Sequence, residues 1–119
     1  MDIRLGHMYY KVVDTEKDII VNAQLCKGCI EYDNHIIRMS LKENDEQDYI
    51  TTLFHEVVHG LLHEHKRDDL NTEENVEDIA QALYQLAIDN PFLFEAEEVK
   101  EDTDITCKPK KKKSSTKKK

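Results

Sequence analysis

Apolar residues follow two different spacings along the chain, and the change of spacing divides the sequence into a strand half and a helix half. Before Leu41, short runs rich in β-branched and aromatic residues alternate with polar turns; they cover residues 8–13, 30–32 and 35–39. Asp33-Asn34 separates the last two runs, and this pattern predicts a β-hairpin. Residues 8–13 fit a strand or a short helix, and residues 18–21 are too few to assign.

After residue 45 the apolar positions recur every three or four residues, as in amphipathic helices. The first such stripe consists of Ile50, Leu53, Phe54, Val57, Val58, Leu61 and Leu62. Asn44 is its predicted N-cap, with Gln47 three residues later. A second helix is predicted from near Asn71, with Glu74 in the matching position, to just before Pro91. Its apolar stripe consists of Val76, Ile79, Leu83 and Leu86.

Strands followed by helices, without an internal repeat, predict a small α+β domain: a β-hairpin or meander and then two helices. A chain of 119 residues fits one domain. We expect the domain to cover residues 1–106, with residues 92–99 packing as a last short segment, and residues 107–119 to form a disordered Lys-rich tail. No apolar run approaches the roughly 18 residues of a membrane span, and the N-terminus lacks the order of a signal peptide. We therefore expect a soluble, cytoplasmic protein without a membrane partner.

Charge is distributed unevenly. All 25 acidic residues lie at or before Asp104, whereas 8 of the 17 basic residues lie in the tail. Residues 1–107 contain 9 basic residues and carry a net charge of −16, and the tail carries +8. A nucleic-acid-binding domain gathers basic residues on a folded face, so we expect no nucleic-acid partner apart from weak contact by the tail.

Cys26 and Cys29 have the spacing of half a zinc knuckle or of a redox pair. A structural zinc ion needs four ligands, however, and Cys107 is the only further cysteine. Gly28 between them favours a simpler interpretation, a turn between two strands.

The first predicted helix contains His55-Glu56-Val57-Val58-His59. His55 and His59 are one helical turn apart on the same face, so both imidazoles can bind one zinc ion. Glu56 projects about 100° further around the axis, where it can reach a water molecule at the metal, which is the position of a general base. The competing interpretation is that both histidines are ordinary polar residues of a surface helix.

Two histidines do not complete a zinc site, so the chain must supply a third ligand. His63 lies about 12 Å along the helix axis from His55, too far to share its ion. His65 has the spacing of the metzincin motif, but Leu62 replaces the glycine of that motif and every methionine precedes it. The second helix offers Glu73 and Glu77, which flank its apolar stripe and would complete a His2Glu site. Acidic residues are also common in a first helical turn, so neither is selected by spacing alone.

Taken together, the motifs resemble the ImmA/IrrE-like metallopeptidases, in particular short phage-type members, over residues 30–91. The resemblance rests on His55-Glu56-Val57-Val58-His59-Gly60, on Glu73-x-x-Val76-x-x-Ile79-Ala80 and on residues 86–91. It implies a zincin-like fold, zinc-dependent hydrolysis of peptide bonds, and a helix-turn-helix repressor of a phage or mobile element as a candidate substrate. It also implies that Glu73 is the third zinc ligand. Because Val76 and Ile79 replace the Ala and Phe of the family pattern, Glu77 remains the alternative ligand.

The predicted function is therefore zinc-dependent peptide hydrolysis with Glu56 as the base. Tyr84, His63 and His65 are candidate donors to the developing oxyanion, and the strand at residues 35–39 could pair with an extended substrate. One alternative is a zincin-fold module that binds metal, lacks turnover and sequesters a protein partner. Another, based on the acidic body, is a nucleic-acid mimic.

Overall fold

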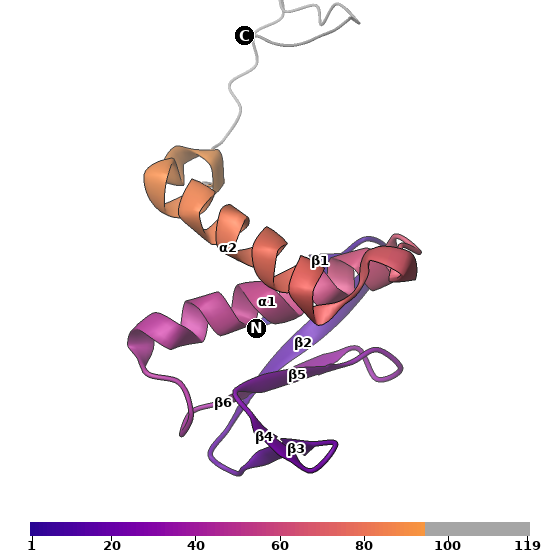
Figure 1. Cartoon of the computed structure of the whole chain (residues 1–119), viewed down its shortest axis with the longest axis vertical. Coiled ribbons are helices and arrows are strands. Elements are labelled where there is room, and N and C mark those ends of the chain that lie inside the picture. Colours follow the sequence, from indigo (N-terminus) through magenta and orange to yellow (C-terminus); the bar gives the residue numbers. More distant parts are fainter. Residues whose placement is uncertain (95–119) are drawn as a thin grey trace, which may run out of the picture.

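The computed structural model describes residues 1–94, in which the strands precede the two long helices (Figure 1). The strands are β1 (Asp2–Leu5), β2 (Met8–Thr15), β3 (Ile19–Val21), β4 (Gln24–Cys26), β5 (Gly28–Glu31) and β6 (Ile36–Ser40). The helices are α1 (Glu46–Glu64) and α2 (Glu73–Asp89), with short 3-10 helices η1 (Asp68–Leu70) and η2 (Pro91–Phe94). The predicted α+β class is confirmed. The predicted tail, and the end of the predicted domain at residue 106, lie outside the described residues.

The main sheet has four strands in the order β1-β2-β6-β5. The predicted hairpin is confirmed, because β5 and β6 are antiparallel with Ile30 opposite Ile37. β6 also pairs with β2, in parallel, which places β6 inside the sheet and β5 at its edge. The prediction that the strand at residues 35–39 could pair with an extended substrate was therefore wrong, since β2 and β5 already pair with both of its sides.

Strands β3 and β4 lie between β2 and β5 in the chain and form a separate two-stranded hairpin. Asn22 and Ala23 make its turn with positive φ angles of 53° and 64°, as a two-residue hairpin loop requires. The chain then passes from β4 to β5 at Lys27, and Gly28 is the first residue of β5 instead of a turn residue. A side chain at Gly28 would approach Arg38 O and Thr52 Cγ2 to 3.1 Å, so glycine permits close contact between β5, β6 and α1.

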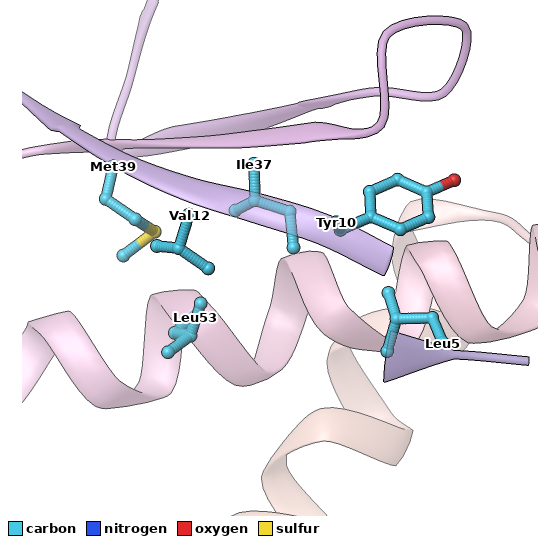
Figure 2. Close-up of a cluster of buried hydrophobic side chains, with 6 residues drawn as sticks. All are labelled: Leu5, Tyr10, Val12, Ile37, Met39 and Leu53. Carbon is cyan, nitrogen blue, oxygen red and sulfur yellow. The ribbon is translucent and has the colours of Figure 1, made fainter. Parts of the chain in front are cut away.

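Helix α1 contributes to two apolar clusters. Figure 2 shows the first, in which side chains of β1, β2, β6 and α1 meet: Leu5, Tyr10, Val12, Ile37, Met39 and Leu53. The second cluster joins α1 to α2 through Val58, Val76 and Ala80. Gly60 allows α1 to approach the sheet closely, because a Cβ atom there would be 2.5 Å from Leu5 Cδ1. No helix within residues 1–94 has the length and apolar character needed to cross a membrane.

Both predicted helix caps are shifted by one residue. Asp45, not Asn44, is the N-cap of α1 and accepts a hydrogen bond from the backbone N–H of Asp48 at 2.7 Å. The Asn44 side chain instead donates to the backbone carbonyls of Ser40 and Lys27 and accepts from Thr52, which anchors the start of α1 to the sheet.

The predicted stripe of α2 was only partly right. Val76 is fully buried and Leu83 partly buried, whereas Ile79 and Leu86 are about 40% exposed, at 39% and 42%. Ala80 takes the inward position instead, since its small side chain lets the two helices approach closely. At the start of α2, Thr72 and not Asn71 is the N-cap, accepting from the backbone N–H of Asn75 at 3.2 Å.

Candidate metal centre

Three side chains from the two helices converge at one point. His55 and His59 come from α1, and Glu73 is the first residue of α2. One ligand atom from each lies within 4.8 Å of the other two. His55 Nε2 is 3.0 Å from one carboxylate oxygen of Glu73, and His59 Nε2 is 3.0 Å from the other. The three residues are therefore close enough to bind a metal ion.

The remaining ring nitrogens face acceptors on the far side of each imidazole. His55 Nδ1 is 2.8 Å from Glu77 Oε1, and His59 Nδ1 is 2.7 Å from Asn71 Oδ1. Hydrogen bonds donated by these Nδ1 atoms leave both Nε2 lone pairs free for a metal. Glu77 thus contacts the outer side of His55. Hydrogen bonds from Gln81 and, to a smaller extent, from His55 hold the pKa of Glu77 below its usual value.

Two imidazole nitrogens and one carboxylate oxygen are the ligand set of many catalytic zinc sites, which keep a further position open for water or substrate. The Glu73 side chain is 80% exposed, so the centre opens to solvent on that side. The donor set and the open side fit zinc.

Glu56 directly follows His55 in α1 and is buried, with only 7% of its surface exposed. Removal from water raises the pKa of its carboxyl to about 7. The Glu73 carboxylate acts in the same direction, and His55 opposes it. A carboxyl group with a pKa near neutrality can both accept and return a proton at physiological pH.

Two cavities of about 670 and 470 Å³ meet at the centre. Glu56 and Glu73 line both of them, and so does Gly28 of the edge strand β5. His55 lines the larger cavity and His59 the smaller one. The shared lining residues place the two cavities side by side, next to the candidate metal ligands and the edge strand β5.

The other candidate residues lie outside the group of three. His63 stacks on Tyr32, with ring centroids 4.0 Å apart, and its Nδ1 lies 3.3 Å from Asp68. His65 is the exposed C-cap residue of α1, because the helix continues through Leu62 without the bend that a metzincin site needs. Tyr84 lines the larger cavity.

Cys26 and Cys29 are free thiols that line the smaller cavity. Burial raises the pKa of Cys29, and Glu56 adds to this effect, so the thiol form is favoured over the reactive thiolate. Among residues 1–94, neither cysteine belongs to a group of three or more potential metal ligands.

Sequence reasoning missed Asn71 and Tyr32. Asn71 was assigned to a helix cap, and Tyr32 to the hairpin. In the structure the Asn71 amide bridges His59 and Tyr32, since its Oδ1 faces His59 Nδ1 and its Nδ2 donates to Tyr32 Oη at 3.0 Å. No spacing rule links these residues, which are 39 positions apart.

No protein-family model, curated protein or solved structure matches this chain. The resemblance to the ImmA/IrrE-like metallopeptidases therefore rests on the motifs quoted above.

Proposed function

We propose that the protein is a zinc-dependent peptidase of zincin type, in which His55, His59 and Glu73 hold the metal and Glu56 is the general base. The observation that carries this proposal is the convergence of the three ligand atoms within 4.8 Å beside a buried glutamate. A structural metal site would not need a buried carboxyl with a pKa near 7 or two cavities that meet at the metal.

When bound, zinc supplies a Lewis acid that polarises the scissile carbonyl and acidifies water. Glu56 accepts the proton of the attacking water and delivers it to the leaving amine. Glu77 and Asn71 keep the two imidazoles in the orientation and tautomer that the metal needs. Glu56 belongs to α1 and Glu77 to α2, and these helices pack together through Val58, Val76 and Ala80.

The substrate is proposed to be an extended polypeptide. β5 is the edge strand of the sheet, and residues 28–30 line one or both cavities. An extended segment can add to such an edge through main-chain hydrogen bonds. The family resemblance makes a helix-turn-helix repressor the first candidate.

Metal analysis of the purified protein tests the first half of the proposal. We expect one zinc ion per chain in the wild type and far less in His55→Ala. A wild-type protein without a bound divalent metal, after incubation with zinc and gel filtration, would refute the proposal.

Hydrolysis is tested with a proteome-derived peptide mixture, with cleavage products identified by mass spectrometry. We expect new termini with the wild type and none with Glu56→Gln, which retains zinc but cannot accept the proton. Similar cleavage by both proteins would show that Glu56 is not the base. Absence of cleavage by the zinc-loaded wild type, in this mixture and with repressor proteins, would favour the sequestering module.

A further inference from the structure

Tyr32 is the first residue after β5, in the turn that leads to β6. Its half-buried side chain lines the smaller cavity together with Glu56, His59 and Glu73. The proposed mechanism so far gives no role to this tyrosine, although it shares a cavity with the base and two of the proposed ligands.

The Tyr32 side chain is held from two directions. Its ring stacks on His63, with centroids 4.0 Å apart and an angle of 19° between the planes. Its hydroxyl oxygen accepts a hydrogen bond from Asn71 Nδ2 at 3.0 Å. Since Asn71 Oδ1 lies 2.7 Å from His59 Nδ1, two hydrogen bonds through one amide fix the phenol relative to the proposed ligand His59.

The orientation of the Asn71 amide decides whether the Tyr32 hydroxyl accepts a hydrogen bond from Asn71 or donates one to it. Asn71 Nδ2 also approaches the backbone carbonyl of His59 at 3.4 Å, and a carbonyl can only accept, so this nitrogen is the donor end. The Tyr32 oxygen is therefore an acceptor toward Asn71, and its own O–H proton is left over. Among the hydrogen bonds formed within residues 1–94, that proton has no acceptor.

The Tyr32 side chain lines the same cavity as Glu56, His59 and Glu73, and a fixed O–H donor within reach of a substrate oxygen can stabilise negative charge that develops on that oxygen. We propose that Tyr32 is a catalytic residue whose hydroxyl donates a hydrogen bond to the oxygen of the scissile carbonyl as that oxygen becomes negatively charged. This inference rests on the proposed peptidase function.

Tyr84 is the competing tyrosine, because it lines the larger cavity. Its ring packs edge-on against Phe54, with centroids 5.9 Å apart, and no hydrogen bond within residues 1–94 orients its hydroxyl. Tyr84→Phe is therefore the matched control for Tyr32→Phe: each variant removes one hydroxyl group from one cavity.

The experiment uses the full chain loaded with Co²⁺, whose absorption spectrum reports the coordination of the metal, and acetohydroxamate as a small oxygen-donor probe. We expect Tyr32→Phe to bind Co²⁺ like the wild type. Its Kd for acetohydroxamate should rise on the order of tenfold, the effect of losing one hydrogen bond to a charged group. Tyr84→Phe should remain within about twofold of the wild type.

Other outcomes separate the two proposals. A wild-type protein that binds no Co²⁺, or binds Co²⁺ without acetohydroxamate, refutes the hydrolytic metal centre and this inference with it. Normal Co²⁺ and acetohydroxamate binding by Tyr32→Phe refutes the role of Tyr32 alone. Weaker Co²⁺ binding with an unchanged acetohydroxamate Kd at metal saturation would show that Tyr32 acts only by supporting Asn71 and His59, and would also overturn the inference.

Discussion

Replacing Glu56 with Gln is expected to stabilise the metal-free protein at alkaline pH. Burial raises the pKa of Glu56 to about 7, compared with 4.5 for the ordinary carboxyl group. Between these values the folded protein binds more protons at this site than the unfolded chain does. Its free energy of unfolding therefore falls as the pH rises from about 4.5 through about 7.

The size of the effect follows from the pKa difference. At about 1.4 kcal/mol per pKa unit, deprotonation of Glu56 costs the folded protein roughly 3 kcal/mol above pH 7. The cost is under about 1 kcal/mol near pH 5, where Glu56 remains protonated in the folded state. Gln fills the same space without a charge, so the variant avoids the cost. For a domain of this size, the melting temperature at pH 8 should rise on the order of 10 °C.

The assay is thermal unfolding in EDTA at pH 5 and pH 8, followed by circular dichroism. Every other titrating group is the same in both proteins, so the difference between them isolates Glu56. Glu74→Gln, at an exposed position of α2, controls for the general removal of a negative charge. Equal stabilisation by Glu56→Gln at both pH values, or none at pH 8, would refute the conclusion that Glu56 is buried at an energetic cost.

Three further outcomes are expected. Glu73→Ala should abolish zinc binding at micromolar metal in a chelator competition assay, whereas Glu77→Ala should weaken it about 10–100-fold, because Glu77 contacts only the outer nitrogen of His55. The reverse order would make Glu77 the ligand. Gly60→Ala should destabilise the fold by about 1–3 kcal/mol in urea titrations, because its Cβ would lie 2.5 Å from Leu5 Cδ1; an unchanged midpoint would show that α1 can move away from β1. Deleting residues 108–119 should leave melting temperature and metal content unchanged, since a run of lysines buries no apolar surface, and a lower melting temperature would show that the tail is docked.

Local spacing was sufficient for several features. Period and turn chemistry predicted the hairpin at residues 30–39, the two helices and their order in the chain. The helical repeat placed His55 and His59 on one face, and the structure brings Glu73 to them. These predictions depend on contacts within one helix or between adjacent strands, where the sequence interval fixes the geometry.

Spacing failed where the partner was distant. The position of β6 inside the sheet depends on its parallel pairing with β2, 25 residues earlier in the chain. Because of this pairing, β5 and not β6 is the edge strand. Likewise, Ala80 instead of Ile79 faces α1 because helix rotation is set by packing against Val58. The same rotation of α2 also decides which of Glu73 and Glu77 lies close to His55 Nε2 and His59 Nε2.

The sequence by itself determined three members of the candidate site, because His55, Glu56 and His59 belong to one helix and follow one repeat. Only the tertiary structure decided that Asn71 faces His59 and that Tyr32 shares its cavity. Such contacts arise when α1, α2 and the β5–β6 turn pack together, and side chains brought together by packing leave no regular interval in the chain.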